Sequence, residues 1–335
     1  MRLSVLDQSP IISGHTPAQA IAETIKLAQA AEQFCYHRYW LAEHHAIAAL
    51  ADPCPEILVT RVAAATSIIR VGTGGVLLPY YSPLKVAEQF RMLEALYPGR
   101  IDLGIGRAPG GDRTTALAMG GGSYAGAENF PDLVQFLTAY LDDALPADHP
   151  FANVKAMPAG STTPQVWLLG SSDYSGALAA QLGLRFAFAH FISADGGDQV
   201  MRDYQRNFQP SQREARPQSL LAVFVICAET DAEAERRAAS IDLRRLNMDR
   251  GVNLPVPNQH EAASRSYSEV ERARIAYNRR RLVLGAPHTV KARLVALTEQ
   301  FEADELMAIT ITGDYHTRLE SYQLLAGAFG LCQRN

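Results

Sequence analysis

The sequence lacks the features that mark exported, membrane-spanning or zinc-knuckle proteins. Its four cysteines (Cys35, Cys54, Cys227 and Cys332) are scattered without a C-x-x-C pair, so neither a disulfide framework nor a zinc knuckle is indicated. The longest wholly apolar run, Leu220 to Ala228, is about half as long as a bilayer-spanning helix. The first ten residues hold too short an apolar core for a signal peptide. We therefore expect a cytoplasmic protein without a membrane span.

An excess of charge of one sign is also absent. The chain has 31 Lys and Arg against 35 Asp and Glu, for a net charge of −4, which argues against a surface built to bind nucleic acid. Hydrophobic residues make up 47% and charged residues 20% of the 335 positions, so the chain can bury a large core. Length alone allows two or three domains, but a single α/β barrel commonly fills about 250 residues or more.

What the sequence does contain is a regular alternation of strand and helix patterns. Each predicted strand is followed by roughly one helix length, and such βα units imply a parallel sheet. Eight repeats match a closed (β/α)₈ barrel (TIM barrel) better than an open doubly wound sheet. The predicted strands are Arg2–Leu6, Tyr39–Ala42, Ile68–Leu78, Ile101–Ile105, Val166–Leu169, Phe186–Ala189, Leu220–Cys227 and Leu306–Thr312. The predicted helices are Pro17–Cys35, Pro55–Ser67, Ser82–Pro98, Asn129–Leu141, Tyr174–Leu182, Asp231–Leu246 and Arg318–Phe329.

One segment interrupts this repeat. We expect a single domain over residues 1–335, with an insertion at 246–286 between the seventh and eighth strands that could act as a lid. The overlapping stretch from Arg236 to Arg281 is rich in arginine. It fits either a solvated helical insertion or a face that attracts a phosphorylated ligand.

The predicted strands end in polar or glycine-rich residues at the same end of the sheet. In a parallel barrel, functional groups gather at the carboxyl ends of the strands, so we expect an active site there. The strand ends in question are Asp7-Gln8-Ser9, Glu43-His44-His45, Gly72-Thr73-Gly74-Gly75, Gly104-Ile105-Gly106-Arg107, Gly170-Ser171-Ser172-Asp173 and His190.

The segment Glu43-His44-His45 allows three interpretations. His44 could project into the barrel mouth as a general acid or base, with Glu43 or His45 orienting it, because an imidazole exchanges protons near neutral pH. Alternatively, the two histidines form a structural hydrogen-bonded pair. A metal site is the third reading, but neighbouring residues on a strand face opposite ways, and the sequence holds no H-x-H or H-E-x-x-H. We therefore predict no metal ligands.

The glycines and the arginine at the third to fifth strand ends suit a flat, anionic ligand. Gly72 to Gly75 is not the dinucleotide fingerprint, so a Rossmann site is not expected. Glycine inside a strand marks either tight strand packing or a planar ligand lying against the backbone. Arg107 offers a forked donor, and Ser171 and Ser172 open a helix whose free N–H groups could cradle a phosphate. A surface salt bridge and an ordinary helix cap are the alternatives.

Three blocks of residues resemble a known family. They are RYWLAEHH (Arg38 to His45), VGTGGVLLPYYSPLKVAEQFRMLEALYPGRIDLGIGRAPG (Val71 to Gly110) and WLLGSSDYS (Trp167 to Ser175). Together they resemble the bacterial luciferase-like monooxygenases, flavin-dependent enzymes that fold as (β/α)₈ barrels. The similarity is greatest to the non-luminescent, single-chain members.

The resemblance implies a role for each matching residue. His44 matches the acid/base beside the reactive flavin carbon, and Gly74-Gly75 matches a pair whose peptide, cis in the luciferases, lies behind the flavin ring. Gly106 stands where luciferases carry a reactive cysteine, so aldehyde specificity does not transfer. The FMN phosphate would bind Arg107, Gly170, Ser171 and the backbone at Tyr174, and the substrate pocket would include Gln8 and His190.

The resemblance also implies an activity and partners. Reduced FMN would react with O₂ to give a peroxyflavin that oxygenates a small organic substrate. Because no Rossmann unit is present, a separate NAD(P)H-dependent flavin reductase would supply the reduced FMN, and the family suggests a homodimer. Alternatives are a deazaflavin (F420)-dependent dehydrogenase, a flavin-binding protein without turnover, and a metal-dependent hydrolase on the same barrel. Residues 111–126 and 250–281 are expected to form the substrate walls.

Overall fold

A computed structural model describes residues 1–108, 110–120 and 128–331. The expected substrate wall at 111–126 therefore lies partly outside the described residues. Within those residues no helix is both long and apolar enough to cross a membrane. Cys54 and Cys227 are free thiols, whereas Cys35 is disulfide-bonded, which the spacing of the cysteines did not indicate.

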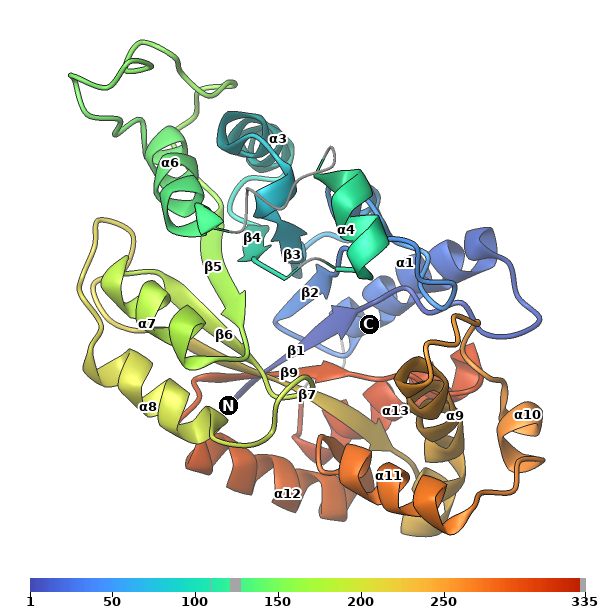
Figure 1. The fold of residues 1–335 in the computed structure, drawn as a ribbon. Coiled ribbons are helices and arrows are strands. Elements are labelled where there is room, and N and C mark those ends of the chain that lie inside the picture. Colours follow the sequence, from blue (N-terminus) through green and yellow to red (C-terminus); the bar gives the residue numbers. More distant parts are fainter. Residues whose placement is uncertain (109, 121–127, 332–335) are drawn as a thin grey trace.

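Parallel strands close into a barrel, as predicted (Figure 1). Neighbouring strands pair in chain order from the first to the seventh, and the ring closes because β9 pairs with both β7 and β1. The fold is therefore a closed (β/α)₈-type barrel rather than an open sheet. The strands of the ring are β1 (Arg2–Asp7), β2 (Arg38–Leu41), β3 (Arg70–Leu77), β4 (Ile101–Gly106), β5 (Gln165–Gly170), β6 (Arg185–Ala189), β7 (Ser219–Cys227) and β9 (Glu305–Ile309).

Helices surround the strands, and local sequence signals start several of them. Thr16 caps the first helix, where its hydroxyl accepts from Gln19 N at 3.2 Å and its own N–H donates to the Gln19 side chain at 2.7 Å. Proline at the first helical position begins others. The helices are α1 (Pro17–Gln33), α2 (Pro55–Ala65), α3 (Pro83–Leu96), α4 (Arg113–Met119), α6 (Phe130–Asp142), α7 (Asp173–Gln181), α8 (Gly197–Arg206), α9 (Asp231–Asp249), α10 (Gln259–Ala263), α11 (Glu269–Arg279), α12 (Pro287–Gln300) and α13 (Tyr315–Ala328), with a short 3₁₀ turn, η1 (Leu78–Tyr80).

The predicted insertion at 246–286 contains a strand that the sequence analysis missed. This strand, β8 (Leu282–Gly285), pairs with the last residues of β7, whereas β9 pairs with the first half of β7. It is only four residues long and follows three arginines, so it carried little periodic signal. Arginines of the insertion form ion pairs, such as Arg279 with Asp242 at 2.7 Å and Arg274 with Asp249 at 2.6 Å.

A charged network fills the amino-terminal end of the barrel. The guanidinium of Arg38 is fully buried and donates to Asp102 at 2.6 Å and to Glu305 at 2.7 Å. Asp102 also accepts from Trp40 Nε1 at 2.9 Å and from Arg70. Burial alone would raise the pKa of Asp102, but the charges of Arg38 and Arg70 outweigh it and hold that pKa below its ordinary value. The network therefore joins β2, β3, β4 and β9 beneath the cavity described below.

Removing one charge from this network should destabilise the fold. We expect Asp102→Asn to lower the free energy of unfolding by about 3 kcal/mol, because Arg70 would lose its carboxylate partner and the buried charge of Arg38 would be left with Glu305 alone. Asp148→Asn, in an exposed loop, should change it by less than about 0.5 kcal/mol. Denaturant unfolding measures both changes, and equal effects in the two variants would contradict the role given to the network.

Candidate active site

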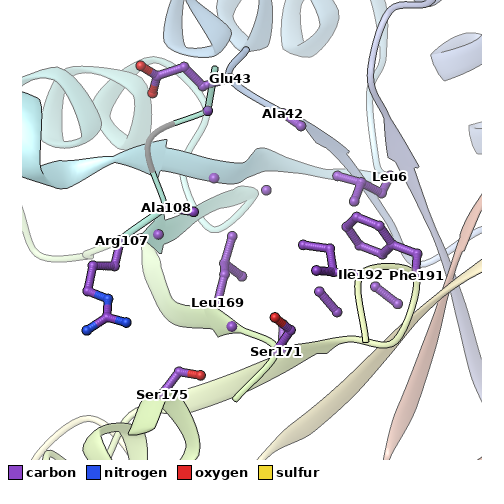
Figure 2. Close-up of a pocket in the computed structure, with 18 of the residues that line it drawn as sticks. Leu6, Ala42, Glu43, Arg107, Ala108, Leu169, Ser171, Ser175, Phe191 and Ile192 are labelled. Atoms are coloured by element: carbon purple, nitrogen blue, oxygen red, sulfur yellow. The ribbon is translucent and has the colours of Figure 1, made fainter. Parts of the chain in front are cut away.

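A cavity of about 270 Å³ opens at the carboxyl end of the barrel (Figure 2). Its floor is apolar, with Leu6, Trp40, Leu169 and Met307 contributed by four different strands. Its polar lining comes from the strand ends that the sequence analysis singled out, namely Gln8, Glu43, His44, Arg107, Ser171 and Ser172. The structure therefore gathers residues from distant parts of the chain at one site.

Glycine keeps one wall of the cavity flat. The Gly74–Gly75 peptide bond is cis, as the family resemblance implied. A Cβ atom at Gly74 would lie 2.7 Å from Leu6 Cδ1, and one at Gly75 would lie 2.6 Å from the backbone oxygen of Gly104. Neither position has room for a side chain, so the backbone itself faces the cavity and suits a planar ligand.

The far end of the cavity carries the groups expected to bind a phosphate. Arg107 follows β4, and its guanidinium carbon lies 4.3 Å from the centre of the Tyr174 ring. Ser171 and Ser172 lie where β5 turns into α7, and Figure 2 shows Arg107, Ser171 and Ser175 at the same end of the cavity. A cation beside the start of a helix is a favourable place for an anion.

Tyr174 lies at the same end of the cavity, where its ring supports Arg107. Its amide donates to Asp173 Oδ1 at 2.8 Å. The family resemblance implies that its backbone would help to hold the phosphate, and this stays a prediction. Gly170 is required by the same turn, because a Cβ there would overlap Ser175 Oγ at 1.9 Å.

His44 lies on the cavity lining, in the loop that follows β2. Its Nδ1 is 3.4 Å from the carbonyl oxygen of Ala42, and its backbone N–H donates to the carbonyl of Asp52 at 3.1 Å. Burial is the main cause that lowers the pKa of His44 to about 4; the contact with the Ala42 carbonyl opposes this shift, and the positive charge of Arg244 makes a smaller contribution to it. The imidazole is therefore neutral at pH 7.

Glu43 and His45 do not orient His44, contrary to one of the expectations. They pair with each other, at 2.7 Å between Glu43 Oε1 and His45 Nε2. Glu43 also accepts from Tyr81 OH at 2.6 Å and from Leu77 N at 2.8 Å. The Glu43 carboxylate thus ties the His44 loop to the end of β3, and it makes no hydrogen bond to the His44 ring.

Of the two residues predicted for the substrate pocket, Gln8 lines the cavity and His190 does not. Side chains alternate along β6, so Ala187 and Ala189 face inward and His190 faces outward, where its ring lies 5.6 Å from that of Phe301. The prediction that His190 lines the pocket is therefore wrong. Phe191 takes that place, and the same alternation could have found it from the sequence.

The described residues contain no group of three or more His, Cys, Asp or Glu side chains placed to hold a metal ion. The polar groups that line the cavity are instead a neutral imidazole, a guanidinium, hydroxyl groups, the Gln8 amide and the Glu43 carboxylate, which is already hydrogen-bonded. This arrangement suits an organic ligand that carries one anionic end.

Comparison with known proteins identifies the class to which this site belongs. A family model described as luciferase-like monooxygenase matches residues 1–304. The chain belongs to that family.

Individual relatives cover nearly the whole chain. An N-acetyl-S-alkylcysteine monooxygenase of Bacillus subtilis (strain 168) is 36% identical, over 98% of this chain and 98% of the relative. The crystal structure of apo-MsnO8 matches with a TM-score of 0.89 and 40% identity over 99% of each chain. The oxygenating constituent of 3,6-diketocamphane monooxygenase from Pseudomonas putida, solved in complex with FMN, shares the fold, with a TM-score of 0.69 and 19% identity over 100% of each chain.

The low pKa of His44 can be measured directly. We expect its imidazole NMR signals, assigned with a His44→Gln variant, to titrate near pH 4 and to stay constant between pH 6 and 8. Because the folded pKa lies below the value of about 6.5 in the unfolded chain, stability should fall as the pH drops from 6.5 towards 4. The variant should lose less stability over that range. A midpoint between pH 6 and 7 for His44 would contradict the assignment.

Proposed function

We propose that this protein is a flavin-dependent monooxygenase that uses reduced FMN and O₂ to oxygenate a small organic substrate. Membership of the luciferase-like family supports a monooxygenase. The observation that carries the choice of flavin is the presence of three kinds of group in one cavity. An anion-binding end (Arg107 and Ser171), a flat backbone wall (Gly74 and Gly75) and a neutral imidazole (His44) all line it.

The residues present fit FMN. The wall without side chains offers a surface for the flat ring system, and Arg107 with the start of α7 offers charge and hydrogen bonds to a terminal phosphate. When bound in its reduced form, FMN would supply the electrons that activate O₂. The FMN complex of a protein with the same fold adds support.

The chain's own residues would then position the reactants and move a proton. His44, neutral at pH 7, can accept or donate a proton through the ring atom that does not contact Ala42. Leu6, Trp40 and Leu169 make the floor apolar and limit the access of water to the reacting groups. Glu43, through its bond to Leu77 N, fixes the His44 loop relative to the glycine wall.

Two partners complete the proposal. A separate NAD(P)H-dependent flavin reductase would deliver reduced FMN, since the glycines at 72–75 lack the dinucleotide fingerprint. The oxygenating constituent of 3,6-diketocamphane monooxygenase, which shares the fold, is consistent with a division of the reaction between an oxygenase and a reductase. A homodimer would use the outer faces of α2 and α3, where Ile57, Met92 and Leu96 are more than half exposed.

The phosphate site can be tested with two flavins. Arg107→Ala should weaken FMN binding by about tenfold or more, because a charge-assisted contact is lost, and should leave riboflavin binding unchanged. Arg206→Ala, an exposed arginine on α8, serves as the control. Flavin fluorescence titration measures all of these affinities. Equal losses for FMN and riboflavin would refute the phosphate assignment.

The role of His44 can be tested in a single turnover. With pre-reduced FMN bound, His44→Ala should slow the reaction with O₂ and substrate by about 10²- to 10⁴-fold while FMN affinity is retained. Stopped-flow absorbance follows the flavin. A rate equal to that of the wild type would remove His44 from the reaction. Tight binding of deazaflavin in place of FMN would favour the dehydrogenase, and FMN binding without O₂ consumption would favour a flavin-binding protein.

A further inference from the structure

Arg244, on the inner face of α9, is buried without a partner. Only 6% of the residue is exposed, and its Nε is enclosed with no hydrogen-bond partner among the described residues. Neighbouring arginines of the same helix differ. Arg237 pairs with Glu233 and Glu320, each at 2.7 Å, and Arg245 donates to the carbonyl of Asn278 at 2.9 Å. Arg245 also leaves one guanidinium nitrogen enclosed without a partner, so what sets Arg244 apart is that it makes no hydrogen bond or ion pair to any described residue.

The charge of Arg244 is costly to the folded protein. Burial lowers the pKa of the guanidinium to about 10, and no carboxylate of the described chain opposes that shift. The side chain is therefore still positively charged at pH 7. Because an unpaired charge away from water destabilises a fold, a well-packed apolar residue would be favoured at this position unless the charge served a ligand.

Arg244 lies beside the candidate active site. Ala238 and Ile241, on the same helix, belong to one buried cluster with Leu6 and Trp40 of the cavity floor. Arg244 lines a small recess of about 20 Å³ with residues of the loop that follows His44 and of the chain that follows α9, among them Ile47, Ala49, Asn247 and Leu254. Its charge is close enough to His44 to contribute, after burial, to the lowered pKa of that imidazole.

The position of Arg244 separates it from the phosphate-binding end. Arg107 follows β4, whereas Arg244 belongs to the helix that follows β7, and Figure 1 places α9 and the ends of β4 and β5 on different sides of the barrel. The loop that follows His44 is held to the chain that follows α9, because Asn253 accepts from Ala48 N at 2.7 Å and donates to the carbonyl of Ala46 at 2.8 Å. Arg107 lines the main cavity and Arg244 lines the separate recess, so a ligand anchored at Arg107 leaves Arg244 to a second molecule.

We propose that Arg244 binds the carboxylate of the substrate and so holds the substrate next to His44. This rests on the proposed function, since it assumes that FMN occupies the Arg107 end. The guanidinium fork matches the two oxygens of a carboxylate. The recess has room for a group of only a few atoms, and its lining by Ile47, Ala49 and Leu254 offers few donors for the additional oxygens of a phosphate.

The test compares a carboxylate with its uncharged counterpart. Wild-type protein should bind benzoate at least tenfold more tightly than benzamide in calorimetric titrations, with or without FMN. Arg244→Gln should abolish that preference. Arg236→Gln, which removes an exposed charge from the same helix, should keep it. No preference in the wild type, or the same preference in Arg244→Gln, would overturn the proposal.

Two further readouts exclude a merely structural role. Benzoate should raise the pKa of His44 in the wild type and not in Arg244→Gln, because it neutralises the charge that lowers that pKa. The variant should melt no lower than the wild type in the absence of ligand, and benzoate should stabilise only the wild type. A variant that melts lower and still prefers benzoate would show that Arg244 only supports the fold.

The same titrations keep this proposal distinct from the proposed function. Arg244→Gln should bind FMN as the wild type does, since its side chain lies away from the phosphate end. If the wild type failed to bind FMN and still preferred benzoate through Arg244, the result would refute the assignment of FMN and support the carboxylate site. If FMN bound normally and the preference for benzoate were missing, the result would refute only the carboxylate site.

Discussion

The buried guanidinium of Arg38 constrains the rest of the structure. It is held between Asp102 and Glu305, and so it joins strands from the start, middle and end of the chain inside the barrel. Trp40 donates to the same Asp102 and also lines the cavity, so the network directly supports the cavity floor. Charged and aromatic side chains fill the amino-terminal end, and the ligand cavity of the described barrel lies at the carboxyl ends of the strands.

The chemistry of that space follows from where the chain places charge. The imidazole of His44 is neutral mainly because it is buried, with a smaller contribution from the charge of Arg244, whereas the nearby carboxylate of Glu43 is engaged by Tyr81, His45 and the backbone of Leu77. The cavity therefore presents a group that can exchange a proton without carrying a fixed charge of its own. Arg107 in this cavity and Arg244 in the separate recess would suit a flavin phosphate and an anionic substrate.

Local sequence patterns predicted much of this arrangement. The alternation of strand and helix patterns predicted the barrel. The rule that functional groups gather at the carboxyl ends of strands predicted five site residues that the structure brings to one cavity: His44, Gly74, Gly75, Arg107 and Ser171. The short strand β8 escaped because four residues carry little pattern. The pairing of Glu43 with His45 and the closeness of Arg244 to His44 could not be predicted, because each depends on how loops and α9 pack over the barrel mouth.

The most direct test is a crystal structure of the protein with FMN. The account predicts that the phosphate lies between Arg107 and Ser171, that the flavin ring rests against Gly74 and Gly75, and that one edge of the ring faces His44. Arg244 should then remain accessible to a second ligand. A flavin bound with its phosphate at Arg244, or bound outside this cavity, would contradict the account.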